Sequence, residues 1–407
     1  MITLAQKVQE RGHEVFFLCL ADAEPLVRAA GLEFVPFALE EFPAGEMDRR
    51  ARILSKLGAT EALEYTVNML ADNSRAALRD GERAIRASRP DAIVLDTVAR
   101  GLNLVAMHLE IPFVHVSNAM HFDFSGHTPL CLFDWPYLAG PAGVVRNGHG
   151  NAMFAMMLAS LAYIQGDYAE SVGLKIDRED PSAGISQLAR LTQTPKEFDF
   201  PSDHWPANFY HTGPWHDLSL RPAIDFPWDK LTGEPIVYAS MGTLQNGSEQ
   251  IFKTIAEAAE APGRQLVLSI GQHLDADEIG PLAANTIVVK HAPQIALLQR
   301  ASLCITHAGL NTVLESLACG VPMVAIPITN DQPGVGARIG YTGTGLVVPM
   351  KQLSAEKLRT AVDSVLTEPS YRENAERLQQ AIARTKGLEM AADIIDRTLR
   401  AAVDEPA

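Results

Sequence analysis

Three short polar segments in the last third of the chain contain the residue types of a phosphate- and sugar-binding site. They are residues 290–298, 306–315 and 330–333. In the second segment an apolar run is followed by a turn at Gly309 and then by a helix start, which Asn311 or Thr312 would cap. A strand–turn–helix of this kind leaves backbone N–H groups and the positive end of a helix dipole available to an anion.

Individual side chains in these segments suit different parts of such a ligand. His307 lies at the turn and carries a ring N–H for a phosphate oxygen, while the Glu315 carboxylate suits a ribose diol. Asp331 and Gln332 follow another predicted strand and suit sugar hydroxyls. Each residue taken alone has an ordinary structural alternative. The ordered set on three successive strand-to-helix loops indicates one ligand crevice.

The elements around these segments alternate between strand and helix patterns. Apolar runs predict strands at 14–20, 91–95, 112–116, 235–239, 265–270, 286–290, 303–306 and 322–326. Strands separated by helical stretches predict parallel sheets covered by helices. Residues 121–225 are less regular, and the proline-rich stretch 213–228 is interpreted as a linker between two α/β domains.

Composition excludes several classes of protein. The 407 residues are 47% apolar and carry a net charge of −15, so the chain is globular and is not expected to bind nucleic acid. Its four cysteines are scattered, which disfavours a metal site or a disulfide framework. No secretory signal or membrane span is visible, so we expect a cytoplasmic protein. The longest apolar stretch, 152–164, is interpreted as a core or pocket-lining helix, with peripheral membrane contact as the alternative.

Residues 291–332 resemble the donor-binding signature of the family 1 glycosyltransferases, which are UDP-glucuronosyl- and UDP-glucosyltransferase-like enzymes of the GT-B fold. The resemblance covers nearly the whole chain and is strongest toward bacterial zeaxanthin- and macrolide-type enzymes. It implies an α/β protein whose two Rossmann-like domains face each other across a cleft. The implied parts are an acceptor-binding domain (1–215), a nucleotide-sugar-binding domain (229–385) and a C-terminal helix (386–407) that packs back on the first domain.

The resemblance also assigns the nucleoside-binding positions. His291 stands where plant members place a tryptophan that stacks on uracil, and Ala292 would meet the uracil edge through its backbone. Gln294 would approach the ribose, and Glu315 matches the carboxylate that binds the ribose hydroxyls.

The phosphate- and sugar-binding positions follow from the same resemblance. His307 matches the histidine that binds the diphosphate, and Asp331 and Gln332 match the pair that binds the sugar hydroxyls. The remaining diphosphate-binding positions are Gly309, Asn311 and Thr312 at the helix start, and Ser240, Gly242 and Thr243 on the opposite loop.

The catalytic base of this family is a histidine in a Gly-His loop after the first strand, oriented by an aspartate. Asp96 ends a predicted strand and is the candidate orienting residue, with capping of the next helix as its alternative role. Residues 1–6 match the helix that follows the Gly-His loop, so the base has no counterpart and is expected upstream of Met1. A sheet without that first strand leaves the strands at 14–20 and 91–95 without a partner between them.

These features predict transfer of a hexose from a UDP-sugar to a hydroxyl of a lipophilic small molecule, with inversion. Gln332 favours glucose by resemblance, and the stretch 121–168 is expected to line the acceptor pocket. The scheme needs neither a metal nor a cofactor, because the UDP-sugar is a substrate. The alternative, supported by the absent base loop, is a non-catalytic sugar-nucleotide-binding relative or a partner-activating subunit.

Overall fold

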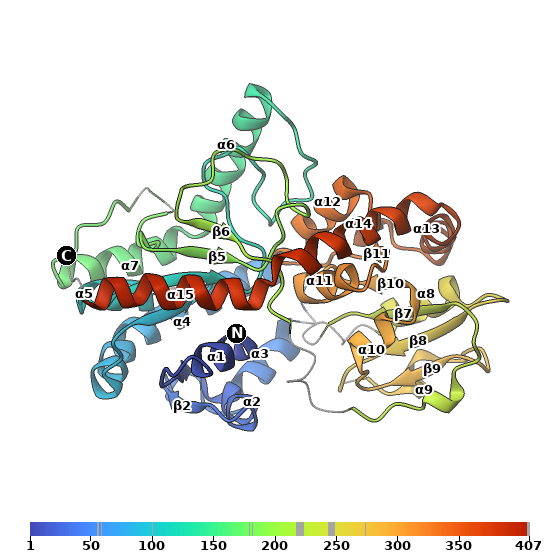
Figure 1. Ribbon diagram of the computed structural model, residues 1–407, viewed down its shortest axis with the longest axis horizontal. Helices are drawn as coiled ribbons and strands as arrows, with labels where there is room; N and C mark the ends of the chain where they lie inside the picture. The colour runs from blue at the N-terminus through green and yellow to red at the C-terminus, as the bar shows by residue number, and fades with distance from the viewer. Residues whose placement is uncertain are drawn as a thin grey trace.

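The computed structural model describes residues 1–54, 57, 59–99, 101–178, 180, 182–216, 224–242, 249–272 and 274–404. It contains two α/β halves side by side (Figure 1). Every strand pair in the described part of the chain is parallel. The parallel, helix-covered arrangement agrees with the alternating apolar pattern of the sequence.

The N-terminal half contains two separate sheets. Its elements are α1 (Ile2–Gln9), β1 (Phe16–Cys19), α2 (Glu24–Ala29), β2 (Glu33–Pro36), α3 (Glu46–Leu54), α4 (Ala59–Ser88), β3 (Ile93–Asp96), α5 (Leu102–His108), β4 (Phe113–Ser117), α6 (Pro141–Met157), α7 (Ala159–Ser171), β5 (Arg190–Thr192) and β6 (Phe209–His211). One sheet is β1-β2 and the other is β3-β4-β5-β6. The two strands that flank the predicted gap, β1 and β3, therefore belong to different sheets, and among the described residues each is hydrogen-bonded along one edge.

The C-terminal half contains one six-stranded sheet. Its elements are β7 (Ile236–Ser240), α8 (Glu249–Ala259), β8 (Gln265–Ser269), α9 (Ala276–Ile279), β9 (Ile287–Val289), α10 (Gln294–Leu298), β10 (Ala301–Thr306), α11 (Leu310–Ala318), β11 (Met323–Ala325), α12 (Gln332–Thr342), β12 (Gly345–Val347), α13 (Ala355–Thr367), α14 (Pro369–Thr385) and α15 (Gly387–Asp404). The strand order is β12-β11-β10-β7-β8-β9. The order reverses between β7 and β10, and ligands of open α/β sheets bind outside the carboxyl ends of strands at such a switch point.

Both faces of this second sheet are buried, which explains its continuous apolar strands. Successive side chains of a strand point to opposite faces. Ile236 and Tyr238 lie in the core on one face, with residues of α11 and α14. Val237 and Ala239 lie in the core on the other face, with residues of α8 and α13. The ends of β7 and β10 are thus fixed from both sides.

Helix α15 returns to the N-terminal half and runs along it (Figure 1). Its apolar residues, among them Leu388 and Ile395, form one buried cluster with Leu4 of α1 and Val114 of β4. At the surface, Arg11 forms an ion pair with Asp393, and the His13 Nε2 atom lies 2.6 Å from Asp396.

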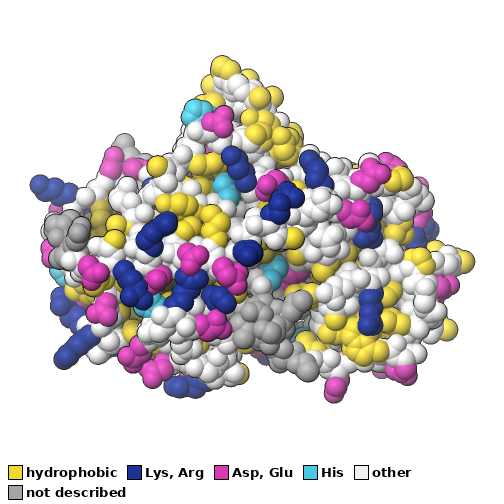
Figure 2. All heavy atoms as spheres, viewed as in Figure 1, with side chains coloured by type: hydrophobic (Ala, Val, Ile, Leu, Met, Phe, Trp, Pro, Cys, Tyr) yellow, Lys and Arg dark blue, Asp and Glu magenta, His cyan; other side chains and the backbone are white. Residues whose placement is uncertain are grey.

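The segment predicted to be irregular, 121–225, contains four regular elements, α6, α7, β5 and β6. Part of the apolar stretch 152–164 is also more exposed than a core or pocket-lining helix allows. Met153, Met156 and Tyr163 are 48%, 70% and 66% exposed, although Phe154 is buried between them. Helix α6 forms the apex of the molecule in Figure 1, and Figure 2 shows hydrophobic side chains gathered there.

Candidate functional site

The sheet reversal places His307 beside the loop that follows β7. Thr306, the last residue of β10, pairs in register with Ser240, the last residue of β7. The His307 ring lies between two glycines. A Cβ atom on Gly242 would lie 2.5 Å from the ring Cε1 atom, and one on Gly309 would lie 2.4 Å from Nε2. Both positions require glycine, because any side chain there would occupy the space of the imidazole.

The His307 imidazole is neutral near pH 7. Burial lowers its pKa to about 4, so the ring carries one N–H and one lone pair at neutral pH. Its Nδ1 atom is buried and has no hydrogen-bond partner in the described part of the chain. A neutral imidazole next to a helix start is suited to donate one hydrogen bond to an anion.

The start of α11 presents its first backbone N–H groups without a side-chain cap. Gly309 is the N-cap residue, and no side chain accepts a hydrogen bond there. The expectation that Asn311 or Thr312 caps this helix is therefore wrong, since both lie inside it. A glycine cap leaves the first amides to an external acceptor, as anion-binding helices require.

Glu315 belongs to a connected polar group on the same helix. It is 3% exposed, and its Oε2 atom accepts a hydrogen bond from Gln294 Nε2 at 2.7 Å. Gln294 Oε1 accepts from the Tyr238 hydroxyl at 3.1 Å, and its Nε2 atom lies 3.3 Å from Thr312 Oγ1. Three of the predicted nucleotide-binding residues thus hold one another in place.

The two remaining predicted nucleoside positions differ in exposure. His291 is exposed and its ring contacts Gln272. Ala292 is buried within the core of the C-terminal half. Thr243 lies outside the described residues.

Asp331 and Gln332 lie at the start of α12, where the two halves meet. Asp331 Oδ2 accepts a hydrogen bond from the backbone N–H of Met120 at 2.9 Å. Gln332 is buried, and its Oε1 atom accepts from the N–H groups of Ile328 and Thr329. Burial raises the pKa of Asp331 above its ordinary value.

The site is also contacted by residues that precede the C-terminal half, and the sequence pattern did not indicate them. Gln193 Nε2 donates to Asn311 Oδ1 at 2.8 Å and also to the Asn118 carbonyl. His216 Nε2 lies 3.8 Å from Glu315 Oε1. The contacts with Asn311 and Glu315 join residues 118 and 99 positions apart, so no local spacing could have shown them.

A cavity of about 330 Å³ extends from the carboxyl ends of β3 and β4 to Arg190 and Phe209, the first residues of β5 and β6. Thr97 and Ser117 line it beside aromatic and polar residues that include His121, Phe122, Phe124, Gln165, Trp205 and Phe209. The predicted pocket stretch 121–168 is therefore represented by its first few residues and Gln165. The loop after β4 contributes both to this cavity and, through Met120, to the contact with Asp331.

Asp96 is the last residue of β3 and directly precedes Thr97 of the cavity wall. Burial raises the pKa of Asp96, and the nearby Met1 amino group opposes that rise. Its Oδ1 atom accepts from the Val98 N–H at 3.1 Å, whereas the N-cap residue of α5 is Gly101 and no side chain caps that helix. The alternative role of capping the following helix is therefore wrong.

Three further observations concern the cysteines, groups of possible metal ligands and long apolar helices. All four cysteines are unpaired. Within the described ranges there is no group of three or more His, Cys, Asp or Glu residues arranged to hold a metal. None of the helices in the part of the chain that the structure describes has the length and apolarity needed to cross a bilayer.

Comparison with known proteins links this geometry to one family. Residues 49–389 match the model described as "UDP-glucoronosyl and UDP-glucosyl transferase". Zeaxanthin glucosyltransferase of Pantoea ananas is 28% identical over 97% of this chain and 92% of that enzyme. Demethyllactenocin mycarosyltransferase of Streptomyces fradiae is 26% identical over 97% of this chain and 82% of that enzyme.

Solved structures agree on the fold. The glycosyltransferase of kitacinnamycin has a TM-score of 0.76 and 24% identity, covering 98% of this chain and 94% of that one. The calicheamicin glycosyltransferase CalG4 has a TM-score of 0.75 at 22% identity, covering 98% and 94%. With a family model matched over most of its length, the chain belongs to the UDP-glucoronosyl and UDP-glucosyl transferase family and is a glycosyltransferase of the GT-B fold.

Proposed function

We propose that the protein transfers glucose from UDP-glucose to a hydroxyl of a lipophilic small molecule, with inversion at the anomeric carbon. The observation that carries the proposal is the buried Glu315–Gln294–Thr312 group next to the His307 ring. Carboxylate and amide oxygens there suit a ribose diol, while the ring N–H and the start of α11 suit a diphosphate.

The acceptor hydroxyl oxygen forms a bond to the anomeric carbon as the bond from that carbon to the diphosphate breaks. The hydroxyl proton passes to a general base that Asp96 would orient and for which the family resemblance identifies no counterpart among residues 1–407, and UDP leaves with the bonding electrons. Negative charge grows on the diphosphate during this step. The His307 N–H and the amides of α11 stabilise that charge, and one such donor contributes about 3–4 kcal/mol in enzymes that stabilise oxyanions.

Uridine is favoured over thymidine because of Glu315. A buried carboxylate facing a deoxyribose would lose one hydrogen-bonding partner, which costs about 1–3 kcal/mol. Two solved neighbours of the fold were crystallised with thymidine diphosphate, at 20% and 19% identity. The test therefore needs to vary the nucleobase (uracil or thymine) separately from the pentose (ribose or deoxyribose) of the donor.

The acceptor is inferred to be lipophilic from the aromatic wall of the cavity. Phe154 of α6 stacks behind that wall, with ring centroids 5.4 Å from Phe122 and 6.1 Å from Phe124. The opposite face of α6 is apolar and exposed, and Arg146 is the single Asp, Glu, Lys or Arg residue between positions 135 and 166. In an acidic protein, a charge-poor apolar face next to the acceptor wall fits contact with a neutral lipid surface from which such an acceptor is taken.

The test is a panel of UDP-glucose, UDP-galactose, dTDP-glucose and dUDP-glucose with several hydrophobic alcohols, with products detected by mass. We expect a glucoside of inverted configuration from UDP-glucose and weaker transfer from both deoxyribose donors. Equal or better transfer from dUDP-glucose would contradict the role of Glu315. Tight UDP-glucose binding without product from any acceptor would favour the non-catalytic alternative.

A further inference from the structure

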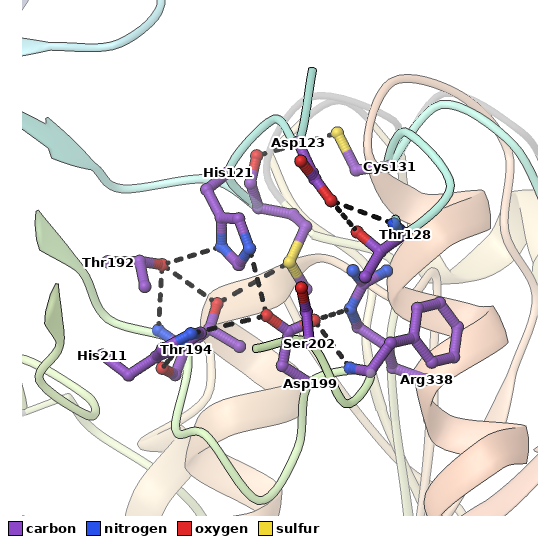
Figure 3. A network of polar contacts seen from close by, with 12 residues as sticks. His121, Asp123, Thr128, Cys131, Thr192, Thr194, Asp199, Ser202, His211 and Arg338 are labelled. Atoms are coloured by element: carbon purple, nitrogen blue, oxygen red, sulfur yellow. Dashed lines mark hydrogen bonds and ion pairs between the residues drawn. The ribbon is translucent and has the colours of Figure 1, made fainter. Parts of the chain in front are cut away.

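A buried ionic cluster joins the two halves of the molecule next to the candidate site (Figure 3). Asp199 lies at its centre, and its Oδ1 atom accepts a hydrogen bond from Arg338 Nε at 2.7 Å. Its Oδ2 atom lies 3.0 Å from His121 Nε2 and 3.9 Å from His211 Nε2. The Asp199 and Arg338 side chains are almost completely buried.

The cluster combines the ends of adjacent strands from one half with a single helix from the other. His121 follows β4, Asp199 follows β5, and His211 is the last residue of β6. Arg338 is on α12, the helix that begins with the predicted sugar-binding residues. The Asp199 carboxylate links these two groups of elements, with one oxygen directed to Arg338 and the other to the two histidines.

The geometry of the cluster is fixed from several directions. Thr192 Oγ1 lies 3.2 Å from His121 Nδ1, and the Thr194 carbonyl oxygen lies 3.2 Å from His211 Nδ1. The Arg338 guanidinium also lies 4.3 Å from the centre of the Phe200 ring. Burial alone would raise the pKa of Asp199, but Arg338 and His121 hold it well below its ordinary value, so the carboxylate is charged.

A buried ion pair contributes little stability compared with apolar packing. We therefore expect the main effect of this cluster to be the orientation that it gives to α12. One face of α12 supplies three successive contacts to the N-terminal half. Asp331 accepts from Met120, the Gly334 N–H donates to the Cys131 carbonyl at 2.8 Å, and Arg338 binds Asp199. Positions 331, 334 and 338 are spaced as one helical face.

The contacted elements also form the cavity wall. His121 lines the cavity, and its ring lies 5.0 Å, between centroids, from both Trp205 and Phe209. Gly334 sits so close to the loop that a Cβ atom would lie 2.5 Å from Cys131. The register of α12 against this wall is thus set at both the middle and the start of the helix.

We propose that Asp199 and Arg338 are positioning residues that hold α12 so that Asp331 and Gln332 face the sugar of the donor beside the acceptor cavity. They affect the binding of the donor's sugar and not of its nucleotide, whose predicted ligands lie on β7, α10, α11 and the adjoining loops. The inference rests on the proposed function, since it takes UDP-glucose as the ligand.

The test compares the affinities of UDP-glucose and UDP by titration calorimetry in Arg338→Met. The expected result is an unchanged UDP affinity and a loss of about tenfold for UDP-glucose, the equivalent of about one sugar hydrogen bond. Arg264→Met is the matched control, because Arg264 is also buried but binds Asp363 and backbone carbonyls of its own half. This control is expected to leave the ratio of the two affinities unchanged.

Two further variants separate positioning from stability. Asp199→Asn combined with Arg338→Met removes both charges, so its melting temperature should recover relative to Arg338→Met while the affinity ratio stays altered. Gly334→Ala leaves every charge in place, but its Cβ displaces α12 from Cys131, and it should alter the ratio in the same direction.

An unaltered ratio in Arg338→Met and Gly334→Ala would overturn the positioning role. Recovery of the ratio together with the melting temperature in the double variant would also overturn it, leaving a structural ion pair. A wild-type chain that binds UDP but shows no transfer contradicts the proposed function while leaving the positioning role measurable. A wild-type chain that binds neither ligand overturns both.

Discussion

At the scale of single residues, the site depends on one neutral imidazole in a space made by two glycines. We expect His307→Ala to retain the fold, since the ring lies between two glycines and its Nδ1 atom has no hydrogen-bond partner among the described residues. Turnover should fall about a hundredfold, the usual effect of losing one charge-stabilising donor. Steady-state rates with UDP-glucose measure this, with His149→Ala on the exposed face of α6 as the control. Turnover near that of the control variant would exclude the assigned role.

The low pKa of His307 predicts a proton linkage to donor binding. The folded pKa of about 4 lies below the value of about 6.5 for a free imidazole, so the ligand-free protein loses stability as pH falls from 6.5 toward 4. A bound diphosphate raises that pKa, because an opposite charge favours the protonated ring. UDP-glucose binding at pH 5.5 should therefore take up protons, and binding at pH 8 should not.

Calorimetry of UDP-glucose binding in two buffers of different ionisation enthalpy measures this uptake. UDP-glucose is preferable to UDP, whose terminal phosphate titrates in the same range. His307→Asn should abolish the uptake while keeping a polar side chain. Identical proton uptake in wild type and His307→Asn would assign the linkage to another group.

The sequence was informative about those site residues that carry a local signal. His307, Gly309 and Glu315 could be predicted as site residues because strand, turn and helix follow one another within ten residues. Met120 and Gln193 could not, because a backbone N–H has no side-chain signature and their partners lie 211 and 118 positions away.

At the scale of elements, strands buried on both faces were predictable and the elements near the cavity were not. Strand β10 lies where its apolar run predicts, although it begins two residues earlier. Strands β5 and β6 have three residues each and contain Arg, Thr and His, so they show no apolar period. Helix α6 contains glycines that disfavour a helix in isolation. At one of them, Gly150, a Cβ atom would lie 2.9 Å from Phe133, so packing overrides propensity.

The exposed face of α6 predicts binding to neutral lipid. Burying a methionine side chain in the interface contributes about 1.5–3 kcal/mol, so Met153 and Met156 together should dominate the affinity. We expect the wild-type chain to float with phosphatidylcholine vesicles and the Met153→Asp/Met156→Asp variant to remain in solution. Leu26→Asp, on the exposed surface of α2, is the matched control. Loss of a dimer instead of vesicle binding in the double variant would assign the face to a second copy of the chain.

At the scale of the whole molecule, several groups of described residues join the two halves. They include the contacts of α12, the hydrogen bond from Gln193 to Asn311, and helix α15, which leaves the C-terminal half and completes a core in the N-terminal half. The resemblance to GT-B enzymes predicted this return of the chain. The composition and periodicity of residues 386–407 could not, since an amphipathic helix does not specify which surface it covers.

This arrangement predicts that one substitution near the C-terminus destabilises the N-terminal half selectively. Ile395 of α15 is buried against Leu4, Val114 and Leu191, so Ile395→Ala should cost about 2–5 kcal/mol of unfolding free energy in that half. Ile255 of α8 is equally buried but belongs to the C-terminal core, and Ile255→Ala is the matched control.

UDP binds the C-terminal half on our proposal and, at a hundred times its Kd, stabilises that half by about 2.7 kcal/mol. In thermal unfolding, UDP should therefore leave the early transition of Ile395→Ala in place but raise the lowered transition of Ile255→Ala. The contrary result is that UDP raises the transition temperature of Ile395→Ala as much as that of Ile255→Ala. That result would mean that the two halves unfold as one unit and that α15 stabilises both of them.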